Sequence, residues 1–322
     1  MRCFYRTAEW YGGEYLEVDG YSCWTAGAAT VRQRRRVKPT SEAQAALNRK
    51  NAERKLVRLI HANFGEDDYR VDLTYDDVHY VDDDEALKRD ARNFLARLRR
   101  LYDRSGVELK YILVVAHGKR GGRGHMHLIV NGDVDRKEIK KLWHGGLCRV
   151  DELQFGEDGV AGLADYIIEQ AEVYAKRWCC SRNLVRPEPV IRDDKIGPVA
   201  ARELADRATS PARLWELAGK LWPGYELASV QSQSIVDQFG GAYFTLRLIK
   251  RTSPHAFRDF EHWSDAWLKR VAMQRRGEVD GRDHILVGDG RTNAKRPKEI
   301  EKLPERAKRG KKGQRRTKKE VR

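Results

Sequence analysis

Apolar and polar positions divide the middle of the chain into segments with either a strand or a helical period. Residues 69–75, YRVDLTY, alternate strictly and place every second, apolar side chain on one face, which predicts a half-buried strand. The apolar runs at residues 110–116 and 125–131 predict further strands on either side of a turn rich in glycine and arginine. Together these runs predict a sheet whose strands are close in sequence.

Apolar positions at helical spacing flank these strands. Residues 85–102 show this spacing after an acidic stretch, residues 82–84, that suits the positive end of a helix. A second helix is predicted at residues 41–64, with Ser41 as its N-cap and its apolar positions in the C-terminal half. Shorter helices are expected at residues 135–143 and 159–176.

The order of these elements predicts the fold class. Strand, helix, strand, strand and helix follow one another between residues 69 and 143. This is the α+β order in which helices cover one face of a mostly antiparallel sheet. We therefore expect a ferredoxin-like arrangement.

Both ends of the chain depart from this pattern. The first forty residues are rich in aromatics and glycine, which makes short strands against the main body plausible. They end in a basic cluster that is either a phosphate contact or a solvated loop: Arg32, Arg34, Arg35, Arg36 and Lys38. Beyond an extended, proline-interrupted stretch, a helix at residues 211–221 and a glycine-separated hairpin at residues 225–236 and 242–250 predict a smaller α/β unit.

The chain is therefore predicted to have four parts. They are an N-terminal aromatic and basic extension with a helix (1–64), a core (65–190), a C-terminal accessory unit (191–276) and a disordered basic tail (277–322).

Charge is unevenly distributed over the 322 residues. The formal net charge is +15, yet residues 291–322 alone hold 15 Lys and Arg against 4 Asp and Glu, which is +11 and leaves +4 for everything before. This distribution favours a polyanionic partner for the tail and only a mildly basic globular part.

Two classes of protein are disfavoured by what the sequence lacks. It has no run of 18 apolar residues and no apolar signal-peptide core, so we expect a soluble, intracellular protein without a membrane partner. Its five cysteines are odd in number and lack CxxC spacing, which disfavours a disulfide framework and a cysteine-ligated zinc site. We interpret the adjacent Cys179 and Cys180 as reduced and structural.

Three histidines stand at the strand ends around the arginine-rich turn. His125 and His127 are two residues apart in a strand, so their side chains project to the same face. If the two runs form a hairpin, His117 comes alongside that pair. Converging imidazoles can bind a divalent cation, whereas isolated histidines near a turn are often merely solvated.

The helix predicted at residues 159–176 offers a second chemical group. On a helical wheel its apolar side chains span about 140°, and Tyr166 falls well outside that arc, whereas Tyr174 falls within it. Tyr166 is thus either an exposed aromatic or a hydroxyl held over the sheet edge. A tyrosine beside a divalent metal suits phosphodiester transesterification, provided that a cation favours the phenolate, since phenol has a pKa of about 10.

In this order the motifs resemble those of the HUH endonucleases. The chain is similar to single-tyrosine rolling-circle replication initiators (Rep proteins) of bacterial plasmids, phages and integrative elements. His125-Met126-His127 looks like their His-hydrophobic-His signature, and Leu73-Thr74-Tyr75 resembles their first motif, on a core strand. The run KRWCCSRNLVRP at residues 176–187 also looks like the segment after the tyrosine in these proteins.

The resemblance assigns roles to individual residues. It implies that His125 and His127 bind the metal, that His117 is a third ligand and that Tyr166 is the nucleophile. It implies an HUH fold for the core and a metal-dependent endonuclease and strand transferase that uses Mg²⁺ or Mn²⁺. The remaining residues expected at the site are the motif-strand residues Thr74 and Tyr75 and the DNA contacts Arg120, Arg123, Lys176 and Arg182.

The implied activity is site-specific nicking and joining of single-stranded or hairpin origin DNA through a covalent 5′-phosphotyrosine, which initiates rolling-circle replication. Such a protein would work in the bacterial cytoplasm. Because the sequence has no GxxxxGK[ST] phosphate-binding loop, a host helicase would have to unwind the DNA. Its oligomeric state is left open.

One departure from the family keeps other functions open. The family commonly has a lysine three residues after the tyrosine, where this chain has Glu169; Gln170 and Lys176 are candidates for its task. A related relaxase or transposase is the nearest alternative, although a tyrosine after the histidine pair disfavours a relaxase. A non-catalytic nucleic-acid-binding protein is the alternative from another class.

Overall fold

The structure, a computed structural model, describes residues 3–25, 41–81, 83–118, 122–170, 177–236, 241–257 and 259–276. The chain divides into a compact unit, Met1–Ile285, and a second unit, Leu286–Arg322, all of which lies outside the described residues. The predicted tail and the basic cluster at residues 32–38 therefore lie outside the described residues too.

The described residues form two antiparallel five-stranded sheets and seven helices, which confirms the mixed α+β class. The sheet in the middle of the sequence has the spatial order β6-β3-β5-β4-β7. Its first elements follow the chain order β3, α2, β4, β5, α3 and β6, the split βαβ connectivity of a ferredoxin-like fold. Their bounds are β3 Tyr69–Tyr75, α2 Asp84–Arg104, β4 Tyr111–Gly118, β5 Gly122–Val130, α3 Arg136–Lys141, β6 Gly146–Glu152 and β7 Cys179–Cys180.

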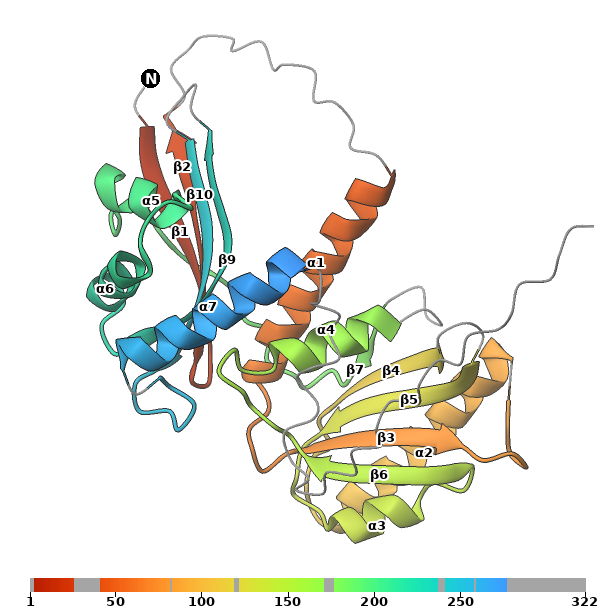
Figure 1. The fold of residues 1–322 in the computed structure, drawn as a ribbon. Helices are drawn as coiled ribbons and strands as arrows, with labels where there is room; N and C mark the ends of the chain where they lie inside the picture. Colours follow the sequence, from red (N-terminus) through yellow and green to blue (C-terminus); the bar gives the residue numbers. More distant parts are fainter. Residues whose placement is uncertain are drawn as a thin grey trace, which may run out of the picture. The chain divides into compact units, whose positions relative to one another are not determined.

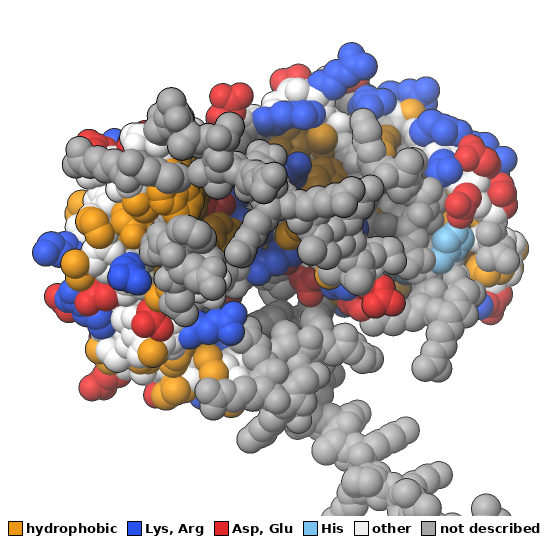
Figure 2. Space-filling view, turned by 90° about the horizontal axis from the view of Figure 1, so that it is seen from above, with side chains coloured by type: hydrophobic (Ala, Val, Ile, Leu, Met, Phe, Trp, Pro, Cys, Tyr) orange, Lys and Arg blue, Asp and Glu red, His pale blue; other side chains and the backbone are white. Residues whose placement is uncertain are grey.

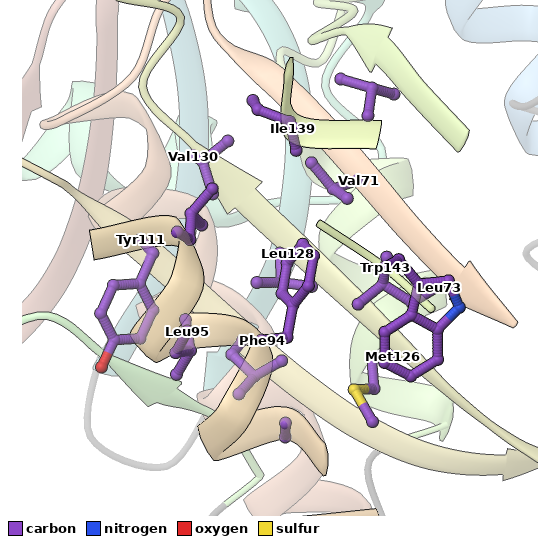
Figure 3. Packing of buried hydrophobic residues seen from close by; sticks show 14 of the residues in the cluster. Val71, Leu73, Phe94, Leu95, Tyr111, Met126, Leu128, Val130, Ile139 and Trp143 are labelled. Carbon is purple, nitrogen blue, oxygen red and sulfur yellow. The ribbon is translucent and has the colours of Figure 1, made fainter. Parts of the chain in front are cut away.

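Alternation along the strands sends one set of apolar side chains to α2 and α3. Leu128 and Val130 of β5 meet Phe94 and Leu95 of α2 there, and Trp143 closes the cluster behind α3 (Figure 3). The N-terminus of α2 begins where Asp83 accepts a hydrogen bond from the backbone N–H of Ala86, as the acidic stretch predicts.

The opposite face of this sheet carries helices as well. Ile112, Val114 and Ile129 pack against α1, Ser41–His61, and α4, Ala161–Gln170. Figure 1 shows α4 across the sheet from α2 and α3. The expectation of helices on one face is therefore incomplete, because the apolar C-terminal half of α1 covers a second face that the local sequence pattern left unassigned.

The second sheet joins the two ends of the chain in the order β8-β1-β2-β10-β9. Residues near the N-terminus pair with residues more than 200 positions later; Val18, for example, lies opposite Leu246. Helices α5 to α7 bury one face of this sheet. The bounds are β1 Cys3–Gly12, β2 Tyr15–Trp24, β8 Val190–Arg192, α5 Pro198–Ala205, α6 Pro211–Leu221, β9 Tyr225–Val236, β10 Gly241–Lys250 and α7 Phe260–Arg276.

This pairing places the predicted N-terminal strands and the predicted C-terminal hairpin in one sheet. The domain boundaries at residues 64, 190 and 276 stay predictions. In the described part of the chain, no helix combines the length and the apolar character needed to cross a bilayer. All five cysteines are described, and none forms a disulfide bond.

Charged residues hold α1 to the second sheet. Glu17 of β2, which is fully buried, receives Arg54 at 2.6 Å and also contacts Arg58. Arg247 of β10 lies 3.8 Å from the same carboxylate. This buried network explains why apolar positions are concentrated at one end of α1: the helix binds one sheet through charges and packs on the other through apolar side chains.

Candidate functional site

Strand register brings the paired histidines onto one face of the middle sheet. His125 lies opposite Thr74 of β3, and His127 lies opposite Asp72. The two imidazole rings are 4.9 Å apart between centroids. The period-two argument from the sequence therefore describes their common direction correctly.

A carboxylate fixes the orientation of His127. Its Nδ1 lies 2.6 Å from Oδ1 of Asp72, and the ring is 5% exposed. Donation of the Nδ1–H to this carboxylate leaves the ring's lone pair on Nε2, the arrangement by which a carboxylate prepares a histidine to bind a metal. The hydrogen bond thus selects the tautomer of His127.

Arg70 completes this chain of polar contacts. Its guanidinium holds both carboxylate oxygens of Asp72, with Nη2 at 2.9 Å and Nε at 3.2 Å. Burial alone would raise the pKa of Asp72, but the hydrogen bond and charge of His127 and the charge of Arg70 outweigh it and hold that pKa below its usual range. Asp72 is therefore a carboxylate in the folded protein.

Tyr166 reaches this group from α4. Its ring meets the ring of His127 edge-on, with centroids 5.3 Å apart and planes at 70°. The buried face of α4 is formed by Ala164, Ile167 and Ile168, and Tyr166 lies partly buried at its margin. The structure thus brings Tyr166 to the histidine pair, as expected of a tyrosine outside the apolar arc.

A salt bridge anchors the helix next to the tyrosine. Arg49 of α1 binds Asp165 at 2.9 Å. This contact joins α1 to the residue that immediately precedes Tyr166.

His117 is not brought to this group. It pairs with Gly124 of β5, so it shares its side of the sheet with the α2 core rather than with the other two histidines. Its Nε2 lies 2.7 Å from Oδ1 of Asp84, at the start of α2. The expectation that a hairpin sets it beside the pair is wrong, because an odd residue number in this register falls on the other face.

The two motif-strand residues separate in the same way. Thr74 is exposed on the histidine face, and its hydroxyl lies 3.5 Å from the carbonyl oxygen of Leu147. Tyr75 is buried on the α2 face, where its hydroxyl donates to Asp90 at 3.0 Å. Thr74 therefore adjoins the candidate site, whereas Tyr75 serves the core.

Only two of the four predicted DNA contacts can be located. Arg123 is exposed next to His125 on β5, pairs with Asp77 and lies over the ring of Tyr80. Arg182 is exposed just beyond β7. Arg120 and Lys176 lie outside the described residues, as does Tyr174, and nothing is described of the side chain of Gln170. On the face drawn in Figure 2, basic side chains are interspersed with acidic ones.

Two residues of the site were not predicted from the sequence. Asp72 and Arg70 occupy the alternate positions of YRVDLTY, the face opposite its apolar side chains. The alternation that predicts the strand also places both residues on the side of Thr74, so the signal was present in the polar half of the pattern.

The donor set fits a divalent cation in part. His125 and His127 are imidazoles on one face, and the tautomer of His127 is set by Asp72. Among the residues that the structure describes, no group of three or more His, Cys, Asp and Glu side chains is arranged to hold a metal ion. A cation here would therefore take further ligands from solvent or from a bound phosphate.

Fold and site together define a mixed α+β protein whose antiparallel sheet presents paired histidines to a tyrosine on a covering helix. Residues 68–171 match the model of a family described as replication-associated protein, of the ORF2 type. The match runs from the start of β3 through α4 and so contains every residue of the candidate site. No curated protein and no solved structure matches the chain.

Proposed function

We propose that the protein is a replication initiator that nicks and joins single-stranded DNA through Tyr166. The observation that carries this proposal is the edge-on contact between Tyr166 and His127, 5.3 Å between ring centroids, beside a second histidine on the same face. A nucleophilic hydroxyl next to a pair of metal-binding imidazoles suits phosphodiester transesterification. The similarity of residues 68–171 to a replication-associated family supports the same role.

The reaction is a balanced exchange of ester bonds. The phenol oxygen of Tyr166 attacks phosphorus, a bond forms between that oxygen and phosphorus, and the bond from phosphorus to the 3′ oxygen breaks. The phenol loses one proton and the departing 3′ oxygen gains one. The product is a 5′-phosphotyrosine and a free 3′-hydroxyl, and a second 3′-hydroxyl can reverse the exchange to join strands.

His125 and His127 would hold a divalent cation, Mg²⁺ or Mn²⁺, which when bound supplies polarisation of the phosphate and stabilises its developing charge. The protein's own contribution is orientation. Asp72 keeps the lone pair of His127 on Nε2, and the packing of α4 holds Tyr166 at the same face. Both restraints act before substrate binds, which lowers the entropic cost of reaching the reactive geometry.

The proposal is tested by incubating labelled single-stranded origin DNA with the protein and Mg²⁺ or Mn²⁺. We expect a covalent protein–DNA adduct that a chelator prevents and that Tyr166→Phe abolishes. Tyr174→Phe is the matched control, since it removes a hydroxyl from the same predicted helix and should leave the adduct intact.

Other results would redirect the assignment. An adduct that survives in Tyr166→Phe and is lost in Tyr174→Phe would move the nucleophile. DNA binding without an adduct on any origin-containing strand would favour a non-catalytic DNA-binding protein, the alternative favoured by the lack of a third metal-binding side chain among the described residues.

A further inference from the structure

Arg70 touches both chemical halves of the candidate site. Its guanidinium carbon lies 5.4 Å from the centroid of the Tyr166 ring, and the same group binds Asp72 through two nitrogens. Asp72 in turn holds Nδ1 of His127. One cation therefore connects the proposed nucleophile to the histidine pair through contacts that each span a single side chain.

We propose that Arg70 is a positioning residue for the cleavage step, acting on Tyr166 directly and on His127 through Asp72. The inference rests on the proposed function, because it assigns a role within that reaction. It also supplies a cation beside the tyrosine in a chain that has Glu169 three residues after it.

The local environment makes this cation effective. The side chain of Arg70 is 20% exposed and that of Asp72 is 18% exposed, so solvent screens their interaction less than it would screen a surface pair. Arg70 stands on β3 opposite Ile129, one of the residues packed under α4. The guanidinium is thus fixed from below by the sheet and from above by the tyrosine ring.

The shape of the arginine side chain matters as much as its charge. A planar guanidinium can bind both oxygens of a carboxylate and lie against an aromatic ring at the same time, whereas a lysine ammonium is a point charge that does one of these well. Arg70 therefore predicts a graded response: loss of charge is worse than loss of the fork.

Arg149 provides a matched control on the same face. It lies opposite Asp72 on the neighbouring strand β6, its side chain is 70% exposed, and it pairs with Asp151. It has the same charge and strand environment, but no contact between it and Tyr166 is described. A substitution there should affect DNA affinity and not the cleavage step.

The test measures single-turnover adduct formation at saturating DNA, with the dissociation constant measured separately by fluorescence anisotropy. We expect Arg70→Met to lower the rate constant about 10- to 100-fold, as for other residues that orient a metal-binding histidine, and to change the dissociation constant less than about threefold. Arg70→Lys should lie between Arg70→Met and the wild type. Arg149→Met should weaken binding at low salt and keep the saturated rate.

A double-mutant cycle tests the route through Asp72. If Arg70 acts partly through that carboxylate, the effects of Arg70→Met and Asp72→Asn on the rate constant will be less than additive. Thermal unfolding of each variant checks that it is folded, and Arg70→Gln replaces the methionine variant if that one does not fold.

The outcomes separate this inference from the function on which it rests. If the wild type forms no adduct, both fail. If the wild type forms an adduct that Tyr166→Phe abolishes, the Arg70 role alone is overturned by a saturated rate in Arg70→Met within threefold of wild type. It is also overturned by a lysine variant no faster than the methionine variant, or by fully additive effects.

Discussion

At the scale of single residues, His61 is a buried imidazole that should make stability depend on pH. Its ring stacks on Tyr15 at 4.1 Å and packs against Phe155. Burial, reinforced by the charge of Arg247, lowers the pKa of His61 to about 3. The unfolded chain, where a histidine has a pKa of about 6.5, therefore takes up the proton first, and the free energy of unfolding falls as pH drops from about 6.5 towards 3.

The size of this effect can be measured by urea unfolding at pH 7 and pH 5. His61 should account for roughly 2 kcal/mol of the loss at pH 5, because each pH unit is worth about 1.4 kcal/mol for one group. His61→Phe keeps a ring in the stack and should remove that share of the loss. His144→Phe, at an exposed position, is the control; equal pH dependence in the two variants would contradict the prediction.

What could be predicted at this scale came from periodicity. The common face of His125 and His127 and the position of Tyr166 off the apolar arc were both readable, because each depends only on local backbone geometry. The side of His117 was not, since it depends on the register between β4 and β5, which shifts beside that residue. Asp72 and Arg70 gain their significance only from what α4 places above them.

At the scale of elements, the buried charges under α1 should be costly to disturb. Burial would raise the pKa of Glu17, but Arg54, Arg58 and Arg247 outweigh it and keep the group ionised. Glu17→Gln leaves those three guanidinium groups without one of their buried counter-charges. We expect a loss of about 3 to 5 kcal/mol in the free energy of unfolding, measured by urea denaturation.

An exposed carboxylate serves as the comparison. Glu85 pairs with Lys88 on α2 with 72% of its side chain exposed, so Glu85→Gln should change the free energy of unfolding by less than about 1 kcal/mol. Similar losses in the Glu17 and Glu85 variants would show that the buried network adds nothing beyond a surface pair.

Elements were predicted well where their partners are near in sequence. The bounds of β3, α6 and β9 agree with the predicted segments, and α2 and β10 agree closely, because periodicity and caps decide them. The strand β6 and the helices α5 and α7 were missed. The second sheet could not be assembled from local patterns, since its pairing of β2 with β10 joins residues more than 200 positions apart.

At the scale of the whole molecule, the uneven charge predicts separate contributions to binding and to chemistry. Residues 291–322 carry +11 of the +15 net charge, whereas the candidate site lies wholly within residues 68–171. Binding that releases counterions from DNA weakens linearly in a plot of log affinity against log salt, with a slope of about −0.7 per neutralised phosphate on a single strand. Deleting residues 291–322 should therefore lower affinity at low salt and make this slope shallower by at least about 2.

The same deletion should leave the adduct-forming rate at saturating DNA unchanged, because no residue of the site is removed. Fluorescence anisotropy from low to moderate salt gives the slope, and single-turnover assays give the rate. Replacing the basic residues of 291–322 with glutamine at constant length separates charge from chain length. If the truncated protein loses cleavage on saturating DNA, or if the glutamine variant keeps the full salt slope, the proposed separation of a charged tail from a catalytic sheet is wrong.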